Sequence, residues 1–457
     1  MYHASYTPNL GISADGFSIS PVLATPLPPL SSLPVDSGSE LLPSRRIIDG
    51  LNLDRDERGQ PVSLSELEAV NSARNRMWKL SDPLIARGAY ELEYLLKLKR
   101  KGWEDKNLDN HFAKQRHVAD TAGPMLNLTW YNKMQKLFGE IDSAARCIPD
   151  SGSGSFRFLD LGCCPGGFSA YILKKNSQAT GVGVSLPVDQ GGHECALEIE
   201  LLNRFTLHFA DLTKYDLRTI RQATMANGNL INIAGTTVDA IQSYLAIENE
   251  LGACASSNKF DIILLDGHHL RTNTNTIEWE IDQLLISQFV IALSYVRSGG
   301  TLVIKQTVFE RYMTAKMIRL FDLLCERVET VKPLTMHANR GSFYLVAHGV
   351  GRGVEGHRQE EFLTKLKEIW EELTFGGQDG TGRFLNLEDF DFVVTTEELK
   401  DSERSGEFLD KLVELGRKVW QGQIKGLEGL FRAENAKHTD RGRRPSRGGR
   451  GFWRGGI

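Results

Sequence analysis

Short apolar segments alternate with amphipathic stretches between about residues 150 and 350 of this 457-residue chain. The apolar segments are typical of buried strands, and the stretches between them repeat apolar residues every three or four positions, as helices do. Such alternation predicts a parallel sheet with helices on both faces. We place strands at 156–161, 181–186, 206–210, 260–266, 300–305 and 342–348, with the clearest helices at 281–296 and 311–326.

The two flanks of this region have different patterns. Next to it on either side, apolar residues recur with helical spacing, and the N-terminal flank opens with a capping-box sequence. The beginning of the chain is rich in proline, serine and glycine, which is typical of disorder. We therefore divide the chain into a disordered or loosely ordered arm, a helical extension, an α/β domain, a second helical extension and a disordered tail, at residues 1–60, 61–149, 150–350, 351–435 and 436–457.

Composition narrows the class of protein. The hydrophobic share of 41%, the charged share of 25% and the net charge of -4 are ordinary for a globular protein. No apolar run approaches the roughly 20 residues that span a bilayer, and the N-terminus lacks a secretory signal pattern. The six cysteines show neither a CxxC pair nor a framework spacing, which favours reduced thiols. We expect an intracellular protein of the nucleus or cytoplasm that does not use a membrane.

The first predicted strand runs into a glycine-rich turn, Asp160-Leu-Gly-Cys-Cys-Pro-Gly-Gly-Phe-Ser169. A strand, a glycine turn and a helix together expose backbone N–H groups to a ligand, and both dinucleotides and S-adenosylmethionine are held in this way. The dinucleotide fingerprint needs a second glycine where Cys164 stands, and an acid after the second strand, which here ends in Gly183-Val-Ser-Leu186. The pattern therefore disfavours NAD. A turn without any ligand is the structural alternative.

The turn closely resembles the first motif of the FtsJ-like RNA ribose 2′-O-methyltransferases, Asp-Leu-Gly-x-x-Pro-Gly-Gly-[Phe/Trp]-Ser. The resemblance implies an S-adenosylmethionine-dependent enzyme that methylates RNA, with a Rossmann-like doubly wound fold whose last strand is antiparallel. Ser185 stands where members often carry an acid for the ribose. Asp211 stands where the family reads the adenine, and a helix N-cap is its alternative role. The cofactor contacts implied by the resemblance are Asp160, Gly162, Pro165, Gly166, Gly167, Phe168, Ser185, Asp211 and Asp266.

The same family uses a Lys-Asp-Lys-Glu tetrad for catalysis. Asp266 and Lys305 each end an apolar strand at the carboxyl edge, where ligands bind in open α/β sheets. We expect Lys305 to be the base and Asp266 to orient it; the alternative for Lys305 is a rim lysine in solvent. Lys133 and Lys136 are the candidates for the first lysine, unless both are surface lysines. Phe343 stands at the glutamate position, so a cofactor-binding RNA-binding or scaffold protein with weak or no turnover is the alternative function.

Two further features bear on ligands. Residues 441–457 are rich in arginine and glycine, contain no acid and include Phe452 and Trp453. Such a tail can bind phosphates and stack on bases, which predicts RNA contact; a solubilising end is the alternative. His268 and His269 follow Asp266, but adjacent side chains of an extended chain point apart, so we expect no metal site.

Overall fold

The computed structural model divides the chain into two compact units, Met1–Val62 and Ser63–Ile457. In the first unit the structure describes only the antiparallel pair β1 (Ile47–Ile48) and β2 (Leu51–Asn52). The rest of the predicted arm, His269, Cys254 and the tail beyond residue 442 lie outside the described residues. The described residues of the second unit are 79–105, 108, 112, 114, 117, 124–152, 154–218, 225–226, 229–230, 259–268, 279–377, 380–401 and 403–442.

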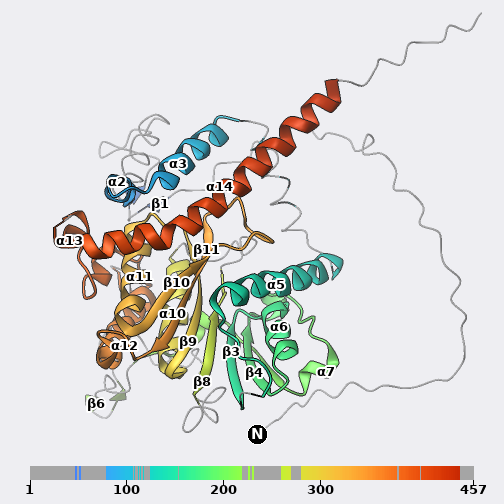
Figure 1. Ribbon diagram of the computed structural model, residues 1–457. Coiled ribbons are helices and arrows are strands. Elements are labelled where there is room, and N and C mark those ends of the chain that lie inside the picture. The colour runs from blue at the N-terminus through green and yellow to red at the C-terminus, as the bar shows by residue number, and fades with distance from the viewer. Residues whose placement is uncertain are drawn as a thin grey trace, which may run out of the picture. The chain divides into compact units, whose positions relative to one another are not determined.

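A seven-stranded sheet forms the centre of the second unit (Figure 1), with the strand order β10-β11-β9-β8-β3-β4-β5. The five strands from β9 to β5 are parallel, and β11 is antiparallel to both of its neighbours. The predicted α/β fold with an antiparallel last strand is therefore confirmed. The strands are β3 (Phe156–Leu161), β4 (Ala179–Ser185), β5 (Phe205–Phe209), β8 (Phe260–Leu265), β9 (Val296–Thr307), β10 (Cys325–Val331) and β11 (Ser342–Val350), beside a separate short pair, β6 (Met225–Ala226) and β7 (Asn229–Leu230).

Helices cover both faces of this sheet (Figure 1), and each face has its own apolar core. Helices α5 (Pro124–Ala145) and α6 (Gly167–Lys175) bury one face, and α10 (Glu280–Tyr295), α11 (Tyr312–Leu324) and α12 (Gln359–Phe375) bury the other. No helix of the described residues is both long enough and apolar enough to cross a membrane. The other helices are α2 (Ser81–Ala86), α3 (Tyr90–Trp103), α7 (Ile199–Leu202), α13 (Thr396–Lys400) and α14 (Gly406–Gly442).

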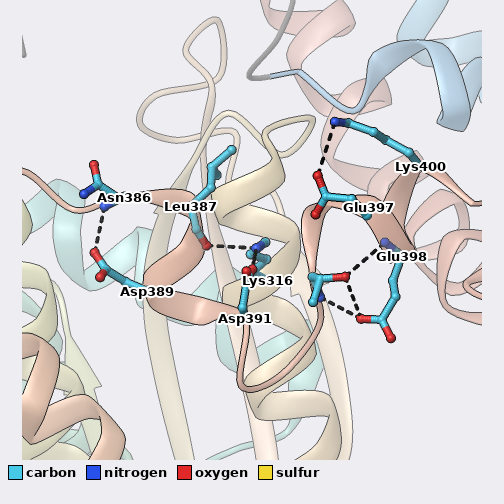
Figure 2. Close-up of polar contacts among 9 residues, drawn as sticks. Lys316, Asn386, Leu387, Asp389, Asp391, Glu397, Glu398 and Lys400 are labelled. Carbon is cyan, nitrogen blue, oxygen red and sulfur yellow. Dashed lines mark hydrogen bonds and ion pairs between the residues drawn. The ribbon is translucent and has the colours of Figure 1, made fainter.

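A buried lysine ties the C-terminal extension to the sheet domain. Lys316 of α11 is fully buried; it donates a hydrogen bond of 2.8 Å to the carbonyl oxygen of Leu387 and forms an ion pair with Asp391 (Figure 2). Asn386 and Asp389 cap the short helix between these two partners. Because a buried ammonium group is costly without partners, these contacts fix the segment against α11.

Candidate active site

The glycine turn after β3 brings two backbone segments into direct contact. Gly162 has φ +81°, in the left-handed region that favours glycine. A Cβ atom at Gly162 would lie 2.4 Å from the Cα atom of Gly267, in the loop after β8. Only a residue without a side chain therefore lets these loops meet. The turn continues into α6 at Gly167, as the sequence predicts.

A pocket opens beside this contact, at the carboxyl ends of β3, β4, β5 and β8. This is the place where the strand order reverses, and open α/β sheets bind ligands there. Three of the predicted cofactor residues, Gly162, Ser185 and Asp211, meet in its wall. The remaining lining residues are Cys164, Leu186, Gln190, Gly192, His193, Ala210, Leu212, Thr213, Gly267, His268, Glu280 and Leu284.

Asp160 carries a buried carboxylate at the base of the turn. Its Oδ2 atom accepts a hydrogen bond of 2.6 Å from the hydroxyl of Ser169, whereas Oδ1 is buried and has no partner among the described residues. Burial raises the pKa of Asp160 to about 7. An orphaned buried oxygen calls for a donor. The ammonium of an amino acid fits this requirement, so the residues present fit the amino acid end of S-adenosylmethionine.

Asp211 has the N-cap role that the sequence offered as an alternative. Its Oδ1 atom accepts hydrogen bonds from the backbone N–H of Thr213 (2.9 Å) and from the hydroxyl of Thr213 (2.8 Å), which makes it the N-cap of the short helix that follows. The residue also lines the pocket. A contact of Asp211 with the adenine stays a prediction.

The other predicted cofactor residues of the turn serve the packing of α6. Pro165, Gly166, Gly167 and Phe168 are buried, and none of them lines the pocket. The ring of Phe168 packs on Phe138 of α5, with 4.9 Å between the ring centroids. Their direct contact with a cofactor stays a prediction.

The carboxyl ends of β8, β9 and the facing end of β11 form a polar cluster next to the pocket. Lys305 Nζ lies 3.2 Å from Asp266 Oδ1, and the Tyr344 hydroxyl donates a hydrogen bond of 2.7 Å to the same oxygen. Tyr344 is the register partner of Lys305 in the antiparallel ladder. Alternate side chains of a strand share a face, so these residues follow Ile262, Leu264 and Val303 on the face that α5 and α6 cover. The structure thus brings together the predicted pair and adds a tyrosine.

Two histidines stand beside Lys305. The positive charge of Lys305, together with burial, lowers the pKa of His268 to about 4. Burial, together with Lys305, lowers the pKa of His337 to about 3. Both imidazoles are therefore neutral near pH 7.

Phe343 stands at the glutamate position of the family pattern, but it does not place an apolar ring in the catalytic site. Phe343 pairs with Gln306 rather than with Lys305, and its buried ring packs on Phe309, with ring centroids 5.3 Å apart, in the core on the opposite face of the sheet. The strand alternation puts Ser342, two residues before Tyr344, on the face of the site. The polar position nearest Tyr344 on this face of β11 is therefore a serine.

The upstream lysines are on the exposed side of α5. Lys133 and Lys136 are both exposed, and within the described part of the chain neither forms an ion pair with Asp266. The helix instead contributes Glu140, which accepts hydrogen bonds from the backbone N–H groups of Leu334 (2.6 Å) and Thr335 (3.0 Å). The first lysine of the tetrad stays a prediction.

The loop that carries His337 is held from within by Lys332. The Lys332 ammonium donates to the carbonyl oxygens of His337 (2.9 Å), Arg340 (2.5 Å) and Ser342 (2.6 Å). His337 itself has φ +61°, which is unusual for a residue with a side chain. Three bonds to one ammonium fix the loop between β10 and β11 at the rim of the site.

Sequence reasoning missed several residues of the site. Gly267 follows Asp266 directly, so its position after a strand could have indicated it. His268 was considered only as a metal ligand or as part of a loop that contacts substrate or is exposed, and it lines the pocket. Tyr344 could have been found from its spacing of two to Val346, which is core. His193 and His337 have no local signal, because only tertiary folding brings them to the pocket and to Lys305.

This strand order, with an antiparallel strand inserted near one edge and a glycine turn after the first parallel strand, agrees with the S-adenosylmethionine-dependent methyltransferase fold that the sequence predicts. The family model of the FtsJ-like methyltransferases matches residues 133–350. The chain therefore contains an FtsJ-like methyltransferase domain, and its cofactor is S-adenosylmethionine.

Curated relatives of this domain are cap-specific mRNA (nucleoside-2′-O-)-methyltransferases 1. The protein from Bos taurus is 26% identical over 214 residues, which cover 46% of this chain and 23% of that protein. The protein from Mus musculus is 25% identical over 232 residues, which cover 50% and 25%. The chain thus matches about a quarter of the length of these relatives. A solved structure of a ribosomal RNA methyltransferase from Plasmodium falciparum has a TM-score of 0.32 and 18% identity, covering 47% of this chain and 96% of that one.

The raised pKa of Asp160 predicts a pH dependence of cofactor binding. Burial sets this pKa to about 7, so the carboxylate that attracts an ammonium is lost as the pH falls through 7. We expect the Kd of S-adenosylhomocysteine, measured by calorimetry, to rise about tenfold from pH 8 to pH 6. Asp160→Asn is the control: it should bind weakly with little pH dependence. The same pH slope in this variant would contradict the assignment.

Proposed function

We propose that the chain is an RNA methyltransferase that transfers a methyl group to ribose 2′-hydroxyl groups. The observation that carries the proposal is the Asp266–Lys305 pair, which lies at the sheet edge directly beside the glycine-turn pocket. His268 lines the pocket, and its Nδ1 atom lies 3.2 Å from the backbone carbonyl oxygen of Asp266, so the two parts form one continuous site. S-adenosylmethionine supplies an electrophilic methyl group when it is bound.

Side chains of the domain would orient the base and accept the proton of the ribose hydroxyl. Asp266 forms an ion pair with Lys305 and accepts a hydrogen bond from Tyr344, and these contacts hold the lysine at one position. Lys305 Nζ, in its neutral form, accepts the proton of the ribose hydroxyl. The imidazoles of His268 and His337 are neutral near pH 7, so they add no positive charge around the ribose hydroxyl.

The choice of RNA as substrate rests on the relatives and on the sequence. The relatives carry the name of mRNA 2′-O-methyltransferases, and the chain shares their domain. The arginine- and glycine-rich residues 441–457 would add a second contact with RNA. An enzyme of this kind would work in the nucleus or cytoplasm, where RNA is modified.

The proposal is tested with purified full-length chain, labelled S-adenosylmethionine and a panel of capped mRNA, ribosomal RNA and transfer RNA. We expect labelled 2′-O-methylnucleosides after nuclease digestion, identified by mass spectrometry. Cofactor binding without any product on the three RNA classes would instead support the alternative, a cofactor-binding RNA-binding or scaffold protein. Label on a base rather than on ribose would overturn the 2′-hydroxyl as the acceptor.

A further inference from the structure

Helix α14 packs closely against the active-site loop, which joins β10 to β11 and carries His337. A Cβ atom at Gly422 would lie 2.4 Å from Cγ of Lys332, and one at Gly426 would lie 2.4 Å from the carbonyl carbon of Ala338. A glycine inside a helix costs about 1 kcal/mol relative to alanine. Two of them, four residues apart, share one helix face, and here they let the loop backbone rest directly on the helix.

A row of exposed cations runs along α14 next to these two glycines. Lys418, Lys425 and Arg432 are exposed and are spaced seven residues apart, close to two helical turns, so they share one face. Gly422 lies four residues after Lys418 and three before Lys425, so the row borders the glycines against which the loop packs. The row, which we call the α14 basic row, is about 21 Å long at 1.5 Å per residue.

The charges of this row are not neutralised locally. In the described part of the chain, none of its three members forms an ion pair with an acidic side chain. The only acid between Lys418 and Arg432 is Glu428, which accepts a hydrogen bond of 3.0 Å from the Tyr94 hydroxyl of α3. Glu428 lies three residues after Lys425 and four before Arg432, so it stands beside the row on the side that contacts α3, and all three cations of the row are exposed.

We propose that the α14 basic row binds the phosphate backbone of the substrate RNA as it leaves the active site. The inference rests on the proposed function, because the row borders the loop that Lys332 bonds to Ser342, two residues before Tyr344 of the site. A line of cations suits a polyanion with regularly spaced charges, and such contacts position a nucleic acid without reading its sequence. The row thus extends the RNA-binding surface from the domain onto the C-terminal extension.

The test uses the full-length chain and a single-stranded RNA of about 30 nucleotides, with binding measured by fluorescence anisotropy at several salt concentrations. We expect Lys418→Gln/Lys425→Gln/Arg432→Gln to weaken binding at least tenfold. Three lost phosphate contacts should also lower the salt slope by about 2. In the methylation assay the KM for RNA should rise, whereas kcat at saturating RNA and the Kd of S-adenosylhomocysteine should stay the same.

The control is a variant with the same change in net charge, Lys365→Gln/Lys400→Gln/Arg404→Gln, whose cations are exposed but paired with neighbouring acids. Equal RNA affinity and salt slope in the two variants would overturn the proposal, as would wild-type chain that binds no RNA. Binding to phosphatidylserine vesicles that depends on the row, without RNA binding, would reassign it to a membrane surface. RNA binding that depends on the row, without turnover, would overturn the catalytic assignment alone.

Discussion

Replacing Lys305 by alanine is expected to lower kcat for methyl transfer by 10²- to 10⁴-fold, the range typical of a lost general base. The reason is the position of its Nζ, 3.2 Å from Asp266 at the edge of the pocket. The Kd of S-adenosylhomocysteine should change little, because Lys305 does not line the pocket. Single-turnover kinetics and calorimetry on the same preparations measure the two effects.

Lys305→Arg separates the base from a purely electrostatic role. Arginine keeps the positive charge and the partner Asp266, but its guanidinium stays protonated and cannot accept a proton. We expect it to be as inactive as Lys305→Ala. An arginine variant with nearly wild-type kcat would show that only the charge matters, and the assignment of the base would then move to another group.

Gly162→Ala is expected to remove the cofactor site. The added Cβ would overlap the backbone of Gly267, at 2.4 Å from its Cα atom, and φ +81° adds strain for any residue with a side chain. Separating the two loops would move the pocket wall and Asp266 together. We expect a loss of S-adenosylhomocysteine affinity of more than 100-fold and a decrease in the free energy of unfolding of about 2–4 kcal/mol.

Gly152→Ala is the matched control for this prediction. Gly152 also has a positive φ, of +105°, but a Cβ atom there would meet nothing within 4 Å. It should lose about 1–2 kcal/mol of unfolding free energy from backbone strain alone and keep its cofactor affinity. Denaturant melts and calorimetry measure both variants. If the two lost cofactor affinity equally, the contact between the loops would not be what holds the site.

The parallel part of the fold could be predicted because its strands are buried on both faces. The predicted strand at 156–161 coincides with β3, and the predicted strand at 260–266 differs from β8 by one residue. The sequence did not reveal β10 (Cys325–Val331). It is an edge strand with Glu326 and Arg327 exposed, so it lacks the apolar run that marks a central strand. The chain therefore appears helical up to 326, although α11 ends at Leu324.

The site was predictable where chemistry follows directly from a strand end. Asp266 and Lys305 each end an apolar run, and their strands are neighbours, so they meet. The face of Phe343 depends on the register of β11, and a shift of one residue exchanges the two faces. The second helical extension was predicted to end at residue 435, whereas α14 continues to Gly442, and nothing in its periodicity indicated that it would support a catalytic loop.

The aromatic side chains packed behind β11 indicate which parts of the chain the catalytic domain needs. The ring of Trp420, from α14, packs edge-to-face on Phe309, with centroids 5.4 Å apart, and Phe309 packs in turn on Phe343. All three side chains are withdrawn from water. The match to the family model ends at residue 350, yet the aromatic packing behind β11 includes Trp420, which lies 70 residues further along the chain. The region that the family model matches therefore does not contain all the residues that support its own active site, and α14 has become a structural part of the domain.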